Sequence, residues 1–154
     1  SLTSLLNCLD LQLALMDMPS SVRTFVEAQP VARLATLDLT GRPHLVPICF
    51  TYLNNRLYSV VDEKPKRSVL LQRLRNIAEN PVATLLCDVY SDNWEQLAWV
   101  MIRCQAEVLE DGAEHGEALS MLRTKYPQYA SMALSERPVI AFTPERVTSW
   151  GVEA

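Results

Sequence analysis

The segment QLAWVMIRCQAEVL, residues 96–109, decides the fold of this chain. From Ala98 to Val108 every second residue is apolar, and this strict alternation indicates a long strand with one face in a hydrophobic core. The opposite face starts apolar and ends polar, in the order Leu97, Trp99, Met101, Arg103, Gln105 and Glu107. A neighbour is therefore expected to cover the first half of that face, and solvent the second.

Shorter segments on both sides of this strand share its period of two. They predict strands at residues 31–37, 43–52, 56–61 and 82–90, and a final pair at 139–142 and 146–150 bent at Thr143-Pro144. Gly41 and the pair Asn54-Asn55 predict tight turns between the first three strands. Apolar residues at helical spacing predict helices at 22–28, 65–79 and 111–125. Six or seven antiparallel strands with peripheral helices predict a mainly β protein, a closed or split barrel.

The length of 154 residues suits one domain. Residues 3–17 have leucines at helical spacing, so residues 1–19 are expected to form an N-terminal helical extension and residues 20–154 the barrel domain. The extension carries acidic residues and no basic segment at its start, which makes it a poor signal peptide. We expect a cytoplasmic protein.

Composition excludes several classes of function. The net charge of −4 argues against binding nucleic acid through phosphate attraction, and no apolar run is long enough to span a membrane. The cysteines are far apart and surrounded by apolar residues, which predicts inert core thiols at Cys8, Cys49, Cys87 and Cys104. The two histidines, His44 and His115, are distant in sequence, so no metal site is expected and no catalytic side chain is assigned. Any catalysis must therefore depend mostly on a cofactor.

The clearest candidate site is a basic segment between residues 64 and 75. It contains no acidic residue, and its five cations are Lys64, Lys66, Arg67, Arg73 and Arg75. The segment coincides with the start of a predicted helix, where free backbone N–H groups and the helix dipole favour an anion such as phosphate. The alternative is a solvated basic helix face, and Arg73 and Arg75 are the members expected to be merely solvated.

The strand before this segment, LYSVVD at 57–62, runs directly into it. A planar ring lying against the strand could be oriented by backbone N–H and C=O groups while its phosphate reached the helix. The alternative is an ordinary barrel strand whose residues belong to the core. Tryptophans usually pack inside proteins, but Trp150 lies near the end of the chain, where a core role is less automatic.

Four segments resemble, in their order, the pyridoxamine-phosphate-oxidase-like flavin-binding split-barrel superfamily. They are ARLATLDLTGRPHLVPICF (32–50), YSVVDEKPKR (58–67), LRNIAENP (74–81) and TPERVTSWG (143–151). More narrowly, DEKPKR (62–67), CDVYSDNWEQLAWV (87–100) and KYPQYA (125–130) resemble a subfamily of coenzyme F-420 (deazaflavin)-dependent reductases. The resemblance covers roughly residues 20–151.

This resemblance implies an antiparallel six-stranded split β-barrel that forms a homodimer, with cofactor sites at the subunit interface. It assigns the cofactor phosphate to Lys64, Lys66 and Arg67, and the edge of the ring to Ser59, Val60, Val61 and Asp62. The remaining cofactor-binding residues that it implies are Pro47 and Ile48 on the adjacent strand, Arg33 and Thr36 on the first strand, and Trp94 and Trp150 across or near the interface.

The function implied by the resemblance is hydride transfer between coenzyme F-420 and a small organic substrate. FMN on the same fold is the alternative cofactor, and a non-catalytic protein that binds flavin or haem is the second alternative, with His44 as the candidate haem ligand. Genuine pyridoxamine-phosphate oxidases continue past the barrel with an arginine-containing tail. The sequence stops soon after Trp150, so vitamin oxidation is not expected.

Overall fold

The computed structural model describes residues 18–62 and 71–152. Its strands form one antiparallel sheet of seven, in the order β2-β1-β5-β6-β7-β4-β3. The strands are β1 (Ala32–Leu37), β2 (Pro43–Ile48), β3 (Thr51–Leu53), β4 (Arg56–Val60), β5 (Val82–Val89), β6 (Ala98–Leu109) and β7 (Val139–Trp150). The helices are α2 (Ser20–Ala28), α3 (Gln72–Glu79) and α4 (Ala113–Lys125), with 3₁₀ turns η1 (Trp94–Gln96) and η2 (Pro127–Ser131). The expected class, mainly β with peripheral helices, is confirmed.

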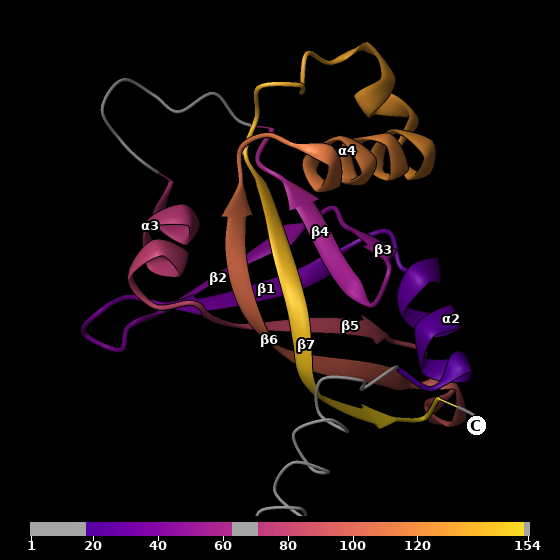
Figure 1. The fold of residues 1–154 in the computed structure, drawn as a ribbon. Helices are drawn as coiled ribbons and strands as arrows, with labels where there is room; N and C mark the ends of the chain where they lie inside the picture. Colours follow the sequence, from indigo (N-terminus) through magenta and orange to yellow (C-terminus); the bar gives the residue numbers. More distant parts are fainter. Residues whose placement is uncertain (1–17, 63–70, 153–154) are drawn as a thin grey trace, which may run out of the picture.

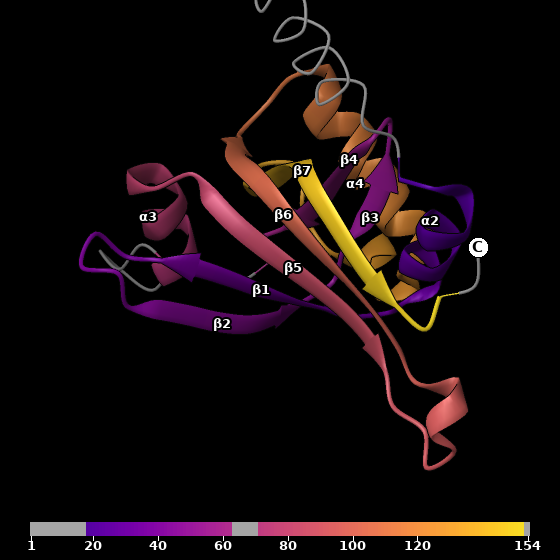
Figure 2. The same ribbon diagram turned by 90° about the horizontal axis from the view of Figure 1, so that it is seen from below.

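The sheet curls into a barrel because its two edge strands are consecutive in the chain. Only Cys49 and Phe50 separate β2 from β3, so the ends of these strands lie within about 11 Å of each other. Figure 2 shows the strands wrapping round from β2 through β7 to β4 and β3. No ladder joins β2 to β3 in the described part of the chain. We call this open line, between the free edge of β2 and the β3–β4 side, the seam.

The count of six strands is one short because the segment 43–52, predicted as one strand, is interrupted at Cys49 and Phe50. At the interruption the Phe50 N–H donates to the Tyr126 hydroxyl, which also lies 3.0 Å from the Phe50 carbonyl oxygen. A side chain from a distant part of the chain thus replaces the ladder partner that a continuous strand would have.

The predicted final pair of strands is wrong in one respect, since residues 139–150 form the single strand β7. Pro144, which cannot donate to a ladder, pairs with Cys104 next to a register shift, and Arg146 pairs with Arg103. Glu145 has no opposite residue, so the bend expected at Thr143-Pro144 is a β-bulge within one strand.

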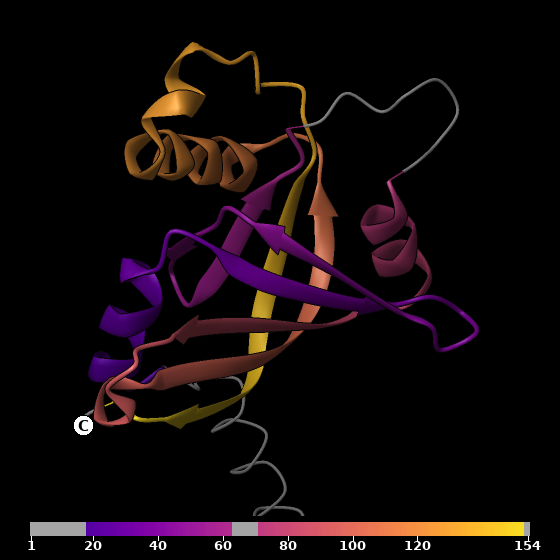
Figure 3. The ribbon, with the colours of Figure 1, turned by 180° about the vertical axis from the view of Figure 1, so that it is seen from behind.

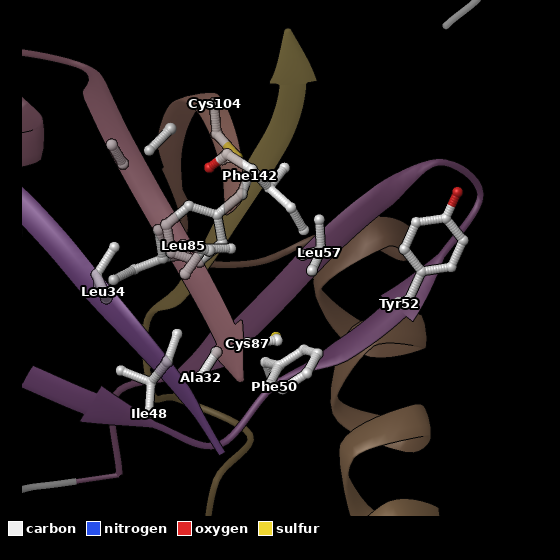
Figure 4. Packing of buried hydrophobic residues seen from close by; sticks show 14 of the residues in the cluster. Ala32, Leu34, Ile48, Phe50, Tyr52, Leu57, Leu85, Cys87, Cys104 and Phe142 are labelled. Carbon is white, nitrogen blue, oxygen red and sulfur yellow. Dashed lines mark hydrogen bonds between the residues drawn. The ribbon is translucent and has the colours of Figure 1, made fainter. Parts of the chain in front are cut away.

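The alternating face of β6 lies in the core as predicted. Its residues from Ala98 to Ala106 are buried, and Val108 packs at the margin of the core. Figure 4 shows the aromatic and aliphatic side chains that fill the barrel, Leu34, Phe50, Leu57, Leu85 and Phe142 among them. Burial raises the pKa of the Cys87 thiol to about 11 and that of Cys104 to about 12, as expected of inert core cysteines. Cys49 differs, because it is half-buried at the seam.

Three helices surround the barrel. Helix α4 covers one end of it, and α2 and α3 lie on different sides (Figures 1 and 3). A second apolar cluster, which includes Leu119 and Leu122 of α4 and Tyr58 of β4, holds α4 in place. The Glu114 carboxylate also accepts a hydrogen bond of 2.6 Å from the Tyr58 hydroxyl and pairs with Arg56.

The predicted turns are present. Gly41 has φ +83°, and Asn54 and Asn55 have φ of 51° and 64°, the left-handed pair that joins strands in a tight hairpin. The helix expected at 3–17 and the first part of the helix expected at 65–79 lie outside the described residues. Within residues 18–62 and 71–152, no helix is long and apolar enough to cross a membrane.

Candidate functional site

A cavity of about 270 Å³ opens at the seam, which we call the seam pocket. One wall is the end of β2, the other wall is β4 with the residues that follow it, and α3 and η2 each add a side chain. Its lining residues are Val46, Pro47, Ile48, Cys49, Ser59, Val60, Asp62, Arg73 and Tyr129.

Both walls of the seam pocket have backbone groups without a ladder partner. Strand β2 pairs with β1 on one side only. Strand β3 pairs with β4 only as far as Tyr58, so Ser59 and Val60 are bonded to β7 alone. The Ser59 hydroxyl donates to the Cys49 carbonyl at 2.7 Å and ties the walls together. Free strand edges present N–H and C=O groups, which can orient the edge of a bound ring.

The polar end of the pocket is formed by Asp62 and Tyr129. The Tyr129 hydroxyl donates to Asp62 Oδ2 at 3.1 Å. Burial, together with the nearby Cys49 and Asp62, raises the pKa of Tyr129, so the phenol stays protonated. Arg73, at the start of α3, adds a cation to the same lining. The pocket lining therefore includes a phenol hydroxyl that is bonded to Asp62, and a guanidinium.

The segment that follows α4 positions Tyr129. Helix α4 ends at Lys125, and Pro127 begins the 3₁₀ turn that contains Tyr129. The ring of Tyr129 packs against that of Tyr126 at a centroid distance of 5.6 Å. The Lys125 ammonium lies 3.8 Å from the centroid of the Phe50 ring, within range of a cation–π contact. The KYPQYA segment thus packs against the seam through aromatic contacts.

The structure brings together five of the residues expected to contact the ring, namely Pro47, Ile48, Ser59, Val60 and Asp62. Val61 is not among them: its side chain is buried in the core and its N–H donates to the Pro138 carbonyl at 2.9 Å. The expected phosphate ligands Lys64, Lys66 and Arg67 lie outside the described residues.

The other expected cofactor residues lie away from the seam pocket. Arg33 pairs with Asp88 at 3.3 Å on the outer face of the sheet. Thr36 is buried, and its hydroxyl accepts a hydrogen bond of 3.0 Å from Asn76. Trp94 and Trp150 are exposed, and Trp150 borders a separate apolar hollow of about 440 Å³.

Sequence reasoning missed four lining residues, Val46, Cys49, Arg73 and Tyr129. Arg73, which was expected to be merely solvated, is half-buried and lines the pocket. The KYPQYA motif was a signal for Tyr129, but nothing in its spacing places it beside Asp62. The interruption that exposes Cys49 has no local signal either.

The lining favours a planar ligand over side-chain catalysis. Among the described residues no group of histidine, cysteine and acidic side chains could hold a metal ion. The imidazole of His115 is buried and bonded to the Arg137 carbonyl at 2.7 Å, away from the pocket. A lining of mixed polarity and free strand edges together suit a ring with hydrogen-bonding edges.

The fold and the pocket define an antiparallel split barrel with a cavity at its open seam. Residues 18–151 match the model of the pyridoxamine 5'-phosphate oxidase family, and the chain belongs to that family.

The chain is also similar to individual proteins of known sequence or structure. The chain is 30% identical to a 5a,11a-dehydrotetracycline/5a,11a-dehydrooxytetracycline reductase of Streptomyces rimosus, over 84% of this chain and 80% of the relative. Its fold is similar to that of a haem-binding protein from Mycobacterium smegmatis (TM-score 0.70, 22% identity, 88% of this chain and 56% of that one). It is also similar to that of a FAD-binding protein from Mesorhizobium loti (TM-score 0.64, 22% identity, 86% and 94%).

Proposed function

We propose that the chain is an oxidoreductase that holds the ring of a flavin-type cofactor in the seam pocket and acts on a small organic substrate. The observation that carries this proposal is the pocket between two free strand edges, which is lined by apolar and polar residues and contains the bonded pair Asp62 and Tyr129. Family membership and the similarity to a reductase support the redox class.

The residues present fit such a ring. Val46 is the half-buried apolar side chain of the lining that can contact a ring, and the backbone beside Ser59 offers partners to its edge. A cavity of about 270 Å³ holds a ring system but not a whole cofactor, so the chain of the cofactor must leave the pocket. When bound, a flavin or deazaflavin supplies the hydride chemistry that no lining side chain can perform.

In this proposal the basic segment that follows β4 in the sequence binds the phosphate of the cofactor. Lys64, Lys66 and Arg67 follow Asp62 in sequence and hold the phosphate by charge-assisted hydrogen bonds in this proposal. Arg73 supports the assignment because it adds a cation to the pocket lining. The Tyr129 hydroxyl, kept protonated, donates a hydrogen bond to a ligand oxygen or holds Asp62 in place.

Coenzyme F-420 is the preferred cofactor and FMN the alternative. The basic segment has more cations than one phosphate needs, and the tail of F-420 carries carboxylates beyond its phosphate. The similarity to a 5a,11a-dehydrotetracycline/5a,11a-dehydrooxytetracycline reductase supports an organic acceptor, without identifying it.

A homodimer forms part of the proposal. The outer face of the sheet carries a band of apolar side chains that crosses β5, β6 and β7 at Leu86, Met101, Trp99 and Trp150. A second copy of the chain that covers this band would place Trp150 near its neighbour's cofactor. Sedimentation should give about twice the chain mass of 17.4 kDa, and Met101→Glu should reduce it to the monomer. A monomeric wild-type protein would exclude the proposed homodimer.

Haem binding without catalysis is the second candidate, favoured by the similarity to a haem-binding fold. The decisive experiment is an absorption spectrum of protein purified from a host that makes F-420, FMN and haem, with mass spectrometry of the molecule released by heat. A deazaflavin or flavin spectrum is expected. Recovery of FMN alone removes the preference for F-420, and a Soret band with no flavin removes the proposed redox function.

A further inference from the structure

A second, polar hollow of about 220 Å³ lies between the β1–β2 hairpin and α3. We call it the hairpin hollow; its lining residues are Asp38, Arg42, Pro43, His44, Gln72 and Asn76. It shares no lining residue with the seam pocket, and the proposed function does not use it.

His44 Nδ1 is buried there without a hydrogen-bond partner. The groups beneath it are bonded to each other: Asn76 donates to Thr36 Oγ1 at 3.0 Å, and Gln72 donates to Asn76 Oδ1 at 2.6 Å. A buried nitrogen left without a partner destabilises a fold, and such groups in proteins are nearly always bonded. His44 lines the hollow, but this nitrogen is shielded from solvent, so the imidazole must turn before it can bond a group that enters.

The hollow is lined by one cation, Arg42, and one carboxylate, Asp38. Arg42 makes no ion pair with any described residue. The one carboxylate in the lining, Asp38, is engaged in its own turn, where Oδ1 accepts from the Thr40 N–H, the Thr40 hydroxyl and the Arg42 N–H. Helix α3 begins at the hollow with no side-chain cap and no acidic residue in its first turn, so the positive end of its dipole lies there.

The hairpin hollow and the seam pocket lie along the same two elements, β2 and α3. On β2, His44 borders the hollow and Val46, the next residue on the same face, borders the pocket. On α3, the neighbours Gln72 and Arg73 divide in the same way. From His44 to Cys49 the chain spans about 17 Å. A cofactor whose ring lies in the seam pocket and whose tail is extended can cover this distance.

We infer that the hairpin hollow is a second anion subsite, which receives a carboxylate of the tail of the ligand whose ring occupies the seam pocket. Arg42 binds the carboxylate by charge, and the His44 imidazole donates the hydrogen bond that it lacks in the free protein. This inference rests on the proposed function, and it supplies the residues that would distinguish F-420 from FMN. FMN ends at a single phosphate and has nothing to place there.

The test compares the two cofactors on the full chain by fluorescence titration. Arg42→Ala and His44→Leu are each expected to weaken F-420 binding by at least about tenfold and to leave FMN binding unchanged. Arg23→Ala, which removes the same charge from α2 on another side of the barrel, is the control and should alter neither. Unchanged F-420 affinity in both variants, or equal losses for both cofactors, overturns the inference.

Besides the titrations with F-420 and FMN, a measurement with a tail fragment alone separates the subsite from the proposed function. Triglutamate alone is titrated into protein labelled with ¹⁵N-histidine, where two side chains give signals and His44→Leu assigns them. The His44 signals should move in wild type and stay still in Arg42→Ala. If neither cofactor binds but triglutamate moves His44, the subsite stands and the proposed function fails. If triglutamate moves nothing, or if a haem Soret band disappears in His44→Leu, the subsite is wrong.

Discussion

The hydroxyl of Tyr126 lies 3.0 Å from the backbone nitrogen of Phe50 and 3.0 Å from its carbonyl oxygen, across 76 residues of sequence. It also lies 2.9 Å from the Pro30 carbonyl. One side chain thus satisfies the backbone at the point where the barrel opens, and it holds Cys49 against the seam pocket. The opening in the barrel is therefore maintained from outside the sheet.

Tyr126→Phe should damage the seam while keeping the aromatic packing. Loss of the hydroxyl leaves the Phe50 N–H without its partner, which should lower the free energy of unfolding by about 1–3 kcal/mol and weaken cofactor binding. Urea denaturation and cofactor titration measure both effects. Tyr90→Phe, at an exposed site, is the control and should match wild type in both. A Tyr126→Phe variant that also matches wild type contradicts the role of Tyr126.

Lys64→Ala combined with Arg67→Ala should weaken cofactor binding and leave the fold intact. Each lost charge-assisted contact contributes ~1.5–3 kcal/mol, so affinity should fall by at least about 100-fold. Titration together with a melting curve distinguishes lost binding from lost folding. A folded double variant with wild-type affinity would remove the phosphate assignment.

Tyr129→Phe should reduce cofactor affinity by about tenfold without unfolding the barrel, because the ring packing remains and only the hydroxyl donor to Asp62 is lost. Asp62→Asn keeps an acceptor oxygen for that donor, and it should be milder than Asp62→Ala. If Tyr129→Phe, Asp62→Asn and Asp62→Ala all bind the cofactor as tightly as wild type, the polar end does not touch the ligand.

Glu114→Gln should lose stability in a pH-dependent way. Hydrogen bonding from Tyr58, together with the nearby Arg56, lowers the pKa of Glu114 from its ordinary value of 4.5, despite some opposing desolvation. A lowered carboxyl pKa adds stability above the ordinary value, and this is lost as pH falls through the folded-state pKa. Wild type should therefore exceed the variant by up to about 1 kcal/mol at pH 7, and the difference should shrink progressively as pH falls below 4.5.

Urea midpoints measured from pH 7 to pH 3 check this prediction. Glu117→Gln, an exposed change on the same helix, should show no such trend. A constant difference between wild type and Glu114→Gln at all pH values would contradict the linkage.

Gly151→Ala should destabilise the end of β7. Gly151 has φ +73°, and a Cβ there would lie 2.0 Å from the Leu97 carbonyl oxygen, so backbone must move. The expected cost is about 1–3 kcal/mol, seen as a lower melting temperature. Gly116→Ala is the matched control, because no atom lies within 4 Å of its Cβ and the residue is helical. That variant should be as stable as wild type or more so.

Local sequence predicted most of the barrel correctly. The alternation from Ala98 to Val108 identified the long strand and its buried face, because the pleat of a strand places every second side chain on one side. Asn54-Asn55 identified a hairpin turn because asparagine tolerates positive φ. Strand and turn signals of this kind depend only on neighbouring residues.

The candidate site was predicted in part. Pro47, Ile48, Ser59, Val60 and Asp62 were expected through family resemblance, and all five line one pocket. Tyr129 reaches that pocket only because α4 packs on the barrel end and η2 turns the chain back toward β4. Arg73 looked like a solvated cation because its helix gives no local sign of the cavity beside it.

The sequence by itself determined most of the strands and the turns between them, since these follow from side-chain period and backbone preference. The family followed from the motifs that the chain shares with it, and the match over residues 18–151 confirms it. Only the tertiary structure decided where the barrel opens and which groups surround the opening. The interruption between β2 and β3 depends on a hydroxyl 76 residues away, and the hairpin hollow on a helix that follows two further strands. Contacts between distant segments leave no periodic trace, because each partner satisfies its own local rules whether or not the other is present.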